Sequence, residues 1–369
     1  MKKIRVLVVD DSAVIRRLIS DLFAKESAIE VAGTASNGIT ALEKIAQLNP
    51  DLVMLDVEMP EMDGLETVTA IRAKWPHLPV IMFSSLTEHG AFITLEALRL
   101  GASDYVTKPV NASGAQAIFE QLRVELIPKI KALCPMTDQE QIPAAAVSPA
   151  PPAIAVRPQP VQRPASRVRI VAIGISTGGP NALHSLIPNL PGNFPVPVVI
   201  VQHMPAVFTR LLADQLSKRS ALDVREGASG AVIKPGQVWI APGGRHMLVQ
   251  RNSNFVQLVT NEGPPENSCR PAVDVLFRSV AECFGRDTLA VVMTGMGRDG
   301  TSGCEKIRTA GGQIIVQDQA SSVVWGMPGT VVQAGLADQI VALDLLPEEI
   351  CRRVGLSSRV RPLAQTRAD

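Results

Sequence analysis

Short apolar runs alternate with helix-like patterns along the first third of the chain. The strand-like runs cover residues 4–9, 31–35, 52–55, 80–83 and 105–106. Between the first two runs, apolar residues recur at helical spacing from Val14 to Phe23, with charged residues between them. Strands that alternate with helices form right-handed β-α-β units around a parallel sheet. The pattern predicts an α/β domain over residues 1–127.

The same alternation returns further along the chain. Strand-like runs are found at residues 168–175, 196–202, 289–293 and 313–317, and helices are expected after Pro180 and through residues 208–216. Three further runs, separated by turn-forming Pro, Gly and Asn residues, predict an antiparallel insertion; they are residues 237–240, 246–250 and 255–260. We expect a second α/β domain, with a doubly wound, mainly parallel sheet and an antiparallel hairpin insertion, over residues 167–356.

The composition changes between these two domains. Residues 128–166 are rich in proline and alanine and show no apolar periodicity. Such stretches form extended, semi-rigid spacers because they have no apolar face to bury. We assign residues 128–166 as an interdomain linker and residues 357–369 as a C-terminal tail.

The charge and composition of the chain exclude several classes of function. The 369 residues include 36 Lys+Arg and 35 Asp+Glu, and only 4% are aromatic. A neutral chain has no positive field for a nucleic acid, and few aromatics are available to stack on bases. No apolar stretch has membrane-spanning length, and the first run ends at Asp10, too early for an export signal. The five cysteines form no C-x-x-C pair, which argues against a zinc site and fits reduced thiols. We expect a cytoplasmic protein that neither binds nucleic acid nor inserts into a membrane.

Polar residues follow the predicted strands of the first domain. In open parallel sheets, ligand chemistry collects at the carboxyl ends of the strands. Carboxylates that converge there suit Mg²⁺, which prefers oxygen ligands. Each residue alone also has an ordinary structural explanation, such as a helix cap, a turn or a solvated lysine. The residues are Asp10, Asp11, Asp56, Ser84 and Lys108.

In the second domain, the strand that ends at Ile175 leads into a glycine-rich turn and then a helix. Gly174, Ser176 and Gly178 form a G-x-S-x-G nucleophile elbow, in which helix N–H groups face a developing oxyanion. With Gly179, the same turn is also an imperfect dinucleotide-binding loop. Such a loop needs an acid at the end of the next strand, and that strand ends in Gln-His-Met. A serine nucleophile is therefore favoured over a nucleotide-dependent enzyme.

Two more residues near strand ends complete a candidate triad with Ser176. His203 supplies a base of near-neutral pKa, and Asp299 supplies a carboxylate to orient it. The structural alternatives are a helix cap for Ser176, a hydrogen-bonded strand-end histidine for His203 and an Asx turn for Asp299. The order Ser, His, Asp differs from that of ordinary α/β-hydrolases, so we do not assign that family. We expect His184 and His246 on the surface or lining the cleft, and not as bases.

The segments V-L-V-V-D-D-S, D-L-V-M-L-D-V-E-M-P-E-M-D-G, M-F-S-S and D-Y-V-T-K-P resemble the receiver domain of two-component response regulators. The resemblance implies a flavodoxin-like fold and a phosphohistidine donor, supplied by a sensor histidine kinase. It implies phosphorylation of Asp56 and Mg²⁺ bound by Asp10, Asp11, Asp56 and the backbone carbonyl of Glu58.

The same resemblance assigns the switch residues of the receiver domain. Lys108 would pair with the phosphate, and Ser84 would form a hydrogen bond to it. Tyr105, the only tyrosine in the chain, would be the switch aromatic, and its alternative role is that of a half-buried strand residue.

The segments G-I-S-T-G-G-P, V-I-V-Q-H-M and T-G-M-G-R-D-G, which follow the receiver-like domain and the linker, resemble the chemotaxis protein-glutamate methylesterases. The resemblance implies hydrolysis of glutamyl methyl esters on chemoreceptors, with release of methanol, and deamidation of selected glutamines. Ser176 would attack the carbonyl, His203 would transfer the proton and Asp299 would orient His203. Oxyanion donors are expected near Thr177 and at the Met296 N–H.

The resemblance also implies how the two domains work together. The unphosphorylated receiver domain would cover the esterase cleft, and the esterase chemistry would need no cofactor of its own. We expect a monomer. The alternative from another class of function is a non-catalytic adaptor, in which a receiver domain is linked to a receptor-docking domain.

Overall fold

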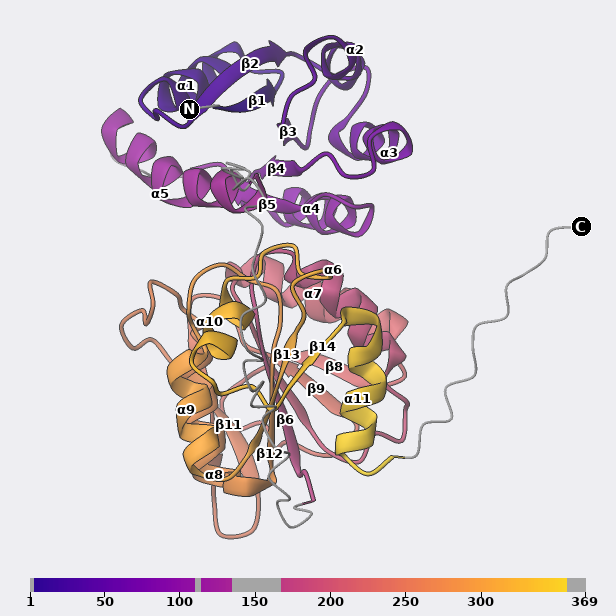
Figure 1. Cartoon of the computed structure of the whole chain (residues 1–369), viewed down its shortest axis with the longest axis vertical. Coiled ribbons are helices and arrows are strands. Elements are labelled where there is room, and N and C mark those ends of the chain that lie inside the picture. The colour runs from indigo at the N-terminus through magenta and orange to yellow at the C-terminus, as the bar shows by residue number, and fades with distance from the viewer. Residues whose placement is uncertain (1–2, 110–113, 135–166, 357–369) are drawn as a thin grey trace, which may run out of the picture.

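The computed structural model describes residues 3–109, 114–134 and 167–356, which form two α/β units (Figure 1). Residues 135–166 of the predicted linker and the predicted tail lie outside the described residues. None of the helices in the described ranges combines the length and the apolar character needed to cross a bilayer.

The N-terminal unit is built on a parallel sheet with the strand order β2-β1-β3-β4-β5. Val6 and Val8 of the first strand pack with the first and last helices, and Leu7 and Val9 pack on the opposite face. Successive side chains point to opposite faces of a strand, so an uninterrupted apolar run is buried on both. The strands are β1 (Ile4–Val9), β2 (Ile29–Ala35), β3 (Leu52–Asp56), β4 (Val80–Ser84) and β5 (Asp104–Thr107). The helices are α1 (Ala13–Ala24), α2 (Gly38–Leu48), α3 (Gly64–Lys74), α4 (Glu88–Arg99) and α5 (Ala115–Leu133).

Polar residues in the loops after β1 and β3 cap the helices that follow. The hydroxyl of Ser12 accepts the Ile15 N–H at the start of α1. Asp63 and Glu66 form a reciprocal capping box at the start of α3. These side chains satisfy N–H groups that have no partner within the helix, so each helix begins directly after its strand–loop connection.

The last helix of the N-terminal unit runs past the predicted domain boundary. The linker was expected to begin at Pro128, but α5 continues through Pro128 to Leu133. Leu122, Leu126 and Ile130 recur at helical spacing and are fully buried on both sides of the proline. A proline inside a helix removes one hydrogen bond, and the burial of this apolar face offsets that loss.

The C-terminal unit contains a parallel sheet of seven strands in the order β14-β13-β12-β6-β7-β9-β8. Alternate residues of β6 pack into different apolar clusters, with Ala172 on one face and Ile173 on the other. The strands are β6 (Ile170–Ile175), β7 (Val198–Gln202), β8 (Asp223–Glu226), β9 (Gln237–Ile240), β12 (Thr288–Val292), β13 (Gln313–Gln317) and β14 (Gln339–Val341). The helices are α6 (Gly179–Leu186), α7 (Ala206–Arg219), α8 (Val273–Phe284), α9 (Thr301–Thr309), α10 (Met327–Gln333) and α11 (Leu346–Arg353).

The antiparallel insertion is smaller than the sequence predicted. β10 (His246–Arg251) and β11 (Val256–Asn261) pair as an antiparallel hairpin, as expected. The third predicted strand, β9, instead lies in the main sheet, parallel to both β7 and β8. Assigning β9 to the insertion was therefore wrong. Its buried Val238 and Ile240 face the same core as β7, and the burial of that face determines its partner.

The two units pack against each other through helices. In Figure 1, α4 and α5 lie on the side of the N-terminal unit that faces α6 and α7. The rings of Tyr105 and Phe208 stack across the boundary, with centroids 4.6 Å apart and an interplanar angle of 15°. The Asn181 side chain donates to the carbonyl of Ala102 at 3.2 Å, and the Gln215 amide donates to Glu96 at 3.2 Å. One apolar cluster is continuous across both units.

Candidate active site and phosphoacceptor site

Three neighbouring strands bring the predicted triad to one edge of the C-terminal sheet. β6 lies between β7 and β12, and all three run parallel. The His203 N–H donates to the carbonyl of Ile175 at 3.3 Å, and the Ser176 N–H donates to the carbonyl of Thr294 at 3.0 Å. The backbones that carry Ser176 and His203 are therefore adjacent where the strands end. This edge is where open α/β sheets place their ligands.

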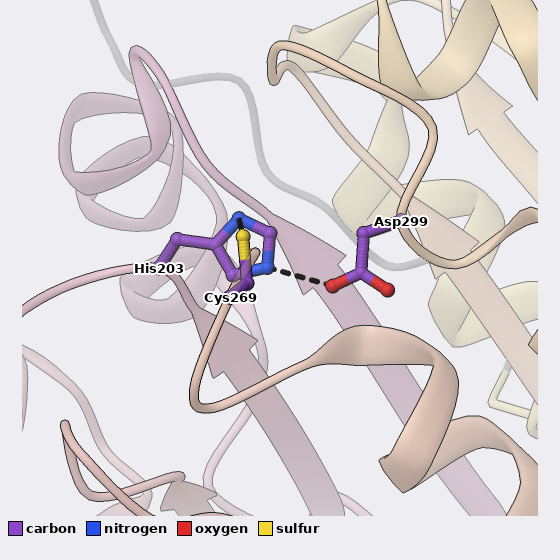
Figure 2. Close-up of side chains that lie close together, drawn as sticks. All are labelled: His203, Cys269 and Asp299. Carbon is purple, nitrogen blue, oxygen red and sulfur yellow. Dashed lines mark hydrogen bonds and ion pairs between the residues drawn. The ribbon is translucent and has the colours of Figure 1, made fainter. Parts of the chain in front are cut away.

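His203 and Asp299 are in direct contact. The Nε2 atom of His203 lies 2.9 Å from Oδ2 of Asp299, as Figure 2 shows. Only 13% of the His203 side chain and 3% of the Asp299 side chain are exposed, so little water screens the pair. The carboxylate holds the proton on Nε2 and leaves Nδ1 as the nitrogen that can accept another proton.

The carboxylate of Asp299 is held by an unusually complete set of donors. Besides His203, it accepts the backbone N–H groups of Val273 at 2.7 Å and Asp274 at 3.0 Å, and the side-chain amide of Asn267 at 3.0 Å. The two N–H groups belong to the first turn of α8, where the helix dipole favours a negative charge. Asn267 lies far from Asp299 in the chain, and no sequence motif identifies it. The only signal was its place in the polar stretch before the α8 pattern.

The environment shifts the pKa of both partners. Burial lowers the pKa of His203, but its contacts with Asp299 and Cys269 outweigh burial and raise that pKa to about 9. Burial raises the pKa of Asp299, but the hydrogen bonds to His203 and to the α8 backbone outweigh it and leave that pKa below its usual value. The resting pair is therefore an imidazolium and a carboxylate.

Ser176 directly follows Ile175, whose carbonyl accepts the His203 N–H, but its hydroxyl makes no hydrogen bond to His203 or Asp299. Its side chain is half-buried, and its hydroxyl makes no hydrogen bond to another described residue. Its carbonyl accepts the Gln202 side-chain amide at 3.0 Å and the Gly179 N–H at 2.8 Å, which fixes the turn. A β-carbon on Gly295 would lie 2.9 Å from the Cβ of Ser176, so only glycine fits there. The serine is held in place by its backbone, with its hydroxyl free to reorient.

Two backbone N–H groups beside Ser176 are free to bind an oxyanion. Within the described part of the chain, neither the Thr177 N–H nor the Met296 N–H donates a hydrogen bond. Thr177 is buried and Met296 is half-buried. The loop that carries Met296 is tied to the serine strand, because the Thr294 hydroxyl donates to the Thr177 carbonyl at 2.9 Å. The two N–H groups thus lie on connected loops at the serine edge of the sheet.

His246 does not belong to this site. Its side chain is 3% exposed, so its expected position on the surface or at the cleft was wrong. Its Nε2 lies 2.9 Å from the carbonyl of Pro264, and its Nδ1 accepts the Ala272 N–H at 3.2 Å. Both ring nitrogens are satisfied, so His246 fixes the loop that leads to α8.

The predicted phosphoacceptor residues come together at the carboxyl end of the N-terminal sheet. Lys108 Nζ lies 2.8 Å from Asp56 Oδ1 and 3.2 Å from Asp10 Oδ2. One carboxylate oxygen from each of Asp10, Asp11 and Asp56 lies within 4.8 Å of the others. Burial raises the pKa of Asp56 to about 6, although the hydrogen bond from Lys108 opposes that rise. Glu58 is exposed on the loop that follows β3.

Ser84 and Tyr105 both point away from Asp56 toward helices. The hydroxyl of Ser84 lies 3.1 Å from the carbonyl of Gly90 and accepts the hydroxyl of Thr94 at 2.6 Å, so it is engaged with α4. Tyr105 is 5% exposed and stacks on Phe208 of the other unit. Tyr105 is therefore more buried than the alternative of a half-buried strand residue predicted, because the C-terminal unit covers its ring.

The contact between the units lies close to the candidate active site. Asn181 is in the first turns of α6, the helix that follows Ser176, and Phe208 is in the first turn of α7, which follows His203. Each makes one of the contacts across the boundary. His184, expected on the surface or at the cleft, is half-buried on α6, and both its ring nitrogens are buried. The His184 ring interacts with the Gln215 side chain, whereas Asn181 Oδ1 makes no hydrogen bond to a described residue.

Comparison with known proteins agrees with both halves of this description. The family described as CheB methylesterase matches residues 171–350, and the family described as response regulator receiver domain matches residues 6–120. A protein-glutamate methylesterase/protein-glutamine glutaminase of Trichodesmium erythraeum is 52% identical over 355 residues, which cover 96% of this chain and 100% of that protein.

Another relative and one solved structure carry related names. A protein-glutamate methylesterase/protein-glutamine glutaminase of a Nocardioides species is 51% identical and covers 98% of both chains. The crystal structure of the Thermotoga maritima CheB methylesterase catalytic domain is 43% identical, covers 50% of this chain and 98% of that one, and has a TM-score of 0.49. With identity above one half along nearly the whole length of the first relative, this chain belongs to the CheB methylesterase family and carries a response-regulator receiver domain in its first half.

Proposed function

We propose that this protein is a phosphorylation-activated serine hydrolase that removes methyl groups from glutamyl esters on chemoreceptor cytoplasmic domains and deamidates selected glutamines there. The observation that carries the proposal is the buried His203–Asp299 pair beside Ser176, in a chain whose relatives are named for these two activities. The phosphodonor is a sensor histidine kinase, and the protein acts as a monomer in the cytoplasm, where such receptors expose their methylated helices.

The proposed reaction gives each residue of the site a role. Ser176 Oγ attacks the ester carbonyl carbon and gives its proton to Nδ1 of His203, because Nε2 is held by Asp299. The Thr177 and Met296 N–H groups bind the oxyanion. His203 then returns the proton to the departing methanol, and a water molecule hydrolyses the acyl-serine by the same route. An amide substrate releases ammonia in place of methanol.

The receiver site fits the chemistry of Mg²⁺-dependent phosphorylation. Its donors are carboxylate oxygens, which Mg²⁺ prefers, and Oδ2 of Asp10 is buried with only the 3.2 Å contact to Lys108. Asp10, Asp11, Asp56 and the carbonyl of Glu58 would hold the ion, which supplies charge neutralisation for the incoming phosphoryl group. Asp56 accepts the phosphoryl group, and Lys108 pairs with it.

Phosphorylation would reach the esterase site through the contact between the units. Ser84 must leave Gly90 and Thr94 to bind a phosphate on Asp56, which alters the start of α4. α4 packs on α6 and α7, the helices that follow Ser176 and His203. A shift of about 1.4 kcal/mol between closed and open arrangements is enough for tenfold activation.

The test is to incubate the full chain with methylated receptor, with and without a small phosphodonor and Mg²⁺, and to measure methanol. We expect methanol release that rises when both are present. A non-catalytic adaptor would bind the receptor and release no methanol in any arm, and that outcome would reject the proposal.

We expect Phe208→Leu to raise the unphosphorylated rate of methanol release about 2- to 10-fold. The substitution removes the stack on Tyr105, worth about 0.5–1.5 kcal/mol, and keeps an apolar side chain in the core. The matched control is Phe255→Leu, which changes an exposed phenylalanine in the β10–β11 turn. An unchanged basal rate in a folded Phe208→Leu protein would argue against inhibition by this contact.

We expect the rate of the unphosphorylated protein to climb with pH, to reach half its maximum near pH 9 and to level off above it. His203 accepts the serine proton only when neutral, and its pKa of about 9 keeps it charged at lower pH. Asp56, with a pKa of about 6, stays ionised over the range from about pH 7 to 10. Cys269→Ala removes a contact that raises the His203 pKa, so it should shift the profile to lower pH. Single-turnover methanol release at each pH measures this, and a flat profile above pH 7 would contradict it.

A further inference from the structure

Cys269 lies beside the His203–Asp299 pair, and the proposed hydrolytic mechanism does not use this thiol. Among the described residues, His203, Cys269 and Asp299 each offer one ligand atom, and these atoms lie within 4.8 Å of one another. Cys269 Sγ lies 3.6 Å from Nδ1 of His203, on the opposite ring nitrogen from Asp299, as Figure 2 shows. The cysteine was not expected here, because its spacing in the sequence matches no metal motif.

We propose that Cys269 and His203 form a binding site for Zn²⁺ or a similar thiophilic divalent cation, with Asp299 as the supporting carboxylate, and that an ion bound there blocks the esterase. A tetrahedral zinc with Zn–S near 2.3 Å and Zn–N near 2.0 Å separates sulfur and nitrogen by roughly 3.5 Å. The 3.6 Å between Cys269 Sγ and His203 Nδ1 matches this separation.

Asp299 occupies the position that a supporting residue takes in zinc sites. A histidine that binds a metal usually donates its other ring N–H to a carboxylate, which fixes the ring and increases its basicity. Here that carboxylate lies 2.9 Å from Nε2 and is itself held by Asn267 and the first turn of α8. The contact with Asp299 therefore orients Nδ1 of His203 toward Cys269 before an ion binds.

This site and the receiver site differ in the types of metal-ligand atoms that they offer. Asp10, Asp11 and Asp56 offer only carboxylate oxygens, which suit Mg²⁺, whereas a thiolate and an imidazole suit Zn²⁺. Cys269 and His203 are both partly exposed, so an ion can reach them from solvent. Two protein ligands leave the other coordination positions to water or a substrate oxygen, which makes the binding reversible.

Binding and hydrolysis compete for the same nitrogen. Zn²⁺ displaces two protons to solvent, the thiol proton of Cys269 and the Nδ1 proton of the resting His203 imidazolium, and it then occupies the Nδ1 lone pair. That lone pair is the one that would accept the Ser176 proton. The inhibition therefore depends on the proposed function, whereas the binding itself does not.

Binding is tested on the full chain with excess Mg²⁺ present to saturate the receiver carboxylates. We expect Co²⁺ to give a near-ultraviolet thiolate charge-transfer absorption and Zn²⁺ to remove it, with one ion per chain in calorimetry. Cys269→Ala and His203→Gln should each abolish the absorption and weaken binding at least tenfold. The matched control is Cys283→Ala, which removes another half-buried thiol, one that contacts the Val249 carbonyl.

Inhibition is tested by measuring methanol release at increasing Zn²⁺, with each protein compared to its own metal-free rate. We expect a chelator-reversible loss in the unsubstituted protein and in Cys283→Ala, and at least tenfold lower sensitivity in Cys269→Ala. No thiolate absorption, or an absorption that survives Cys269→Ala, would overturn the metal site. Normal metal spectra in a protein that releases no methanol would overturn the proposed function and leave the metal site standing.

Discussion

Ser176→Ala should lower methanol release about 10⁵-fold or more, leaving only the small catalysis that the oxyanion donors and binding provide. The substitution removes one oxygen atom that makes no hydrogen bond to a described residue, so neither the turn nor the His203–Asp299 pair loses a contact. The measurement is single-turnover methanol release from methylated receptor, with receptor binding followed in parallel.

The control for this prediction is Ser185→Ala on α6, the helix that follows Ser176. Its hydroxyl donates to the Asn181 carbonyl within α6 and faces solvent, so we expect an unchanged rate. If Ser176→Ala releases methanol at the native rate, Ser176 is not the nucleophile. If it also keeps its effect on receptor output, the adaptor function is favoured.

Asp299→Asn should lower the rate constant about 10⁴-fold while the protein stays folded. An amide cannot stabilise the imidazolium, and its NH₂ group must face either His203 Nε2 or the Asn267 amide, both of which are donors to the carboxylate. The rate is measured by single-turnover methanol release, and folding by circular dichroism and thermal unfolding.

The control for Asp299 is Asp274→Asn. Asp274 lies next in the same network, where it accepts Asn267 at 2.9 Å and the Gly303 N–H at 2.6 Å but does not touch His203. We expect a comparable loss of stability with a far smaller loss of rate. Equal losses of rate in the two variants would mean that Asp299 acts only by holding the loop.

Local patterns in the sequence predicted the parts of the fold that local chemistry decides. The apolar runs of β1 and β13 and the helical spacing of α1 are properties of neighbouring residues, and the strands and helix formed where predicted. β9 was misplaced because Val238, Trp239 and Ile240 read as a strand in either sheet. Only the distant β7 decides which sheet it joins.

Local sequence patterns likewise predicted only part of the candidate site. Ser176, His203 and Asp299 could be named because each follows a recognisable strand, and parallel strands end at a common edge. Asn267 and Cys269 could not, because they lie in a tight turn, closed by backbone hydrogen bonds between Glu266 and Cys269, that no strand pattern places at this edge. Tyr105 could be named but not its partner, since Phe208 belongs to the other unit.

The polar groups buried between the two units limit how low the basal rate of the unphosphorylated enzyme can be. The side chains of Asn181, His184 and Gln215 lose hydration in the closed arrangement, and Asn181 Oδ1 gains no bond to a described residue in return. Separation of the units lets water bind them again, which offsets part of the cost of parting the Tyr105–Phe208 stack. A receptor population would therefore lose methyl groups slowly even without a signal. Phosphorylation by the kinase would raise the rate of adaptation above this basal rate.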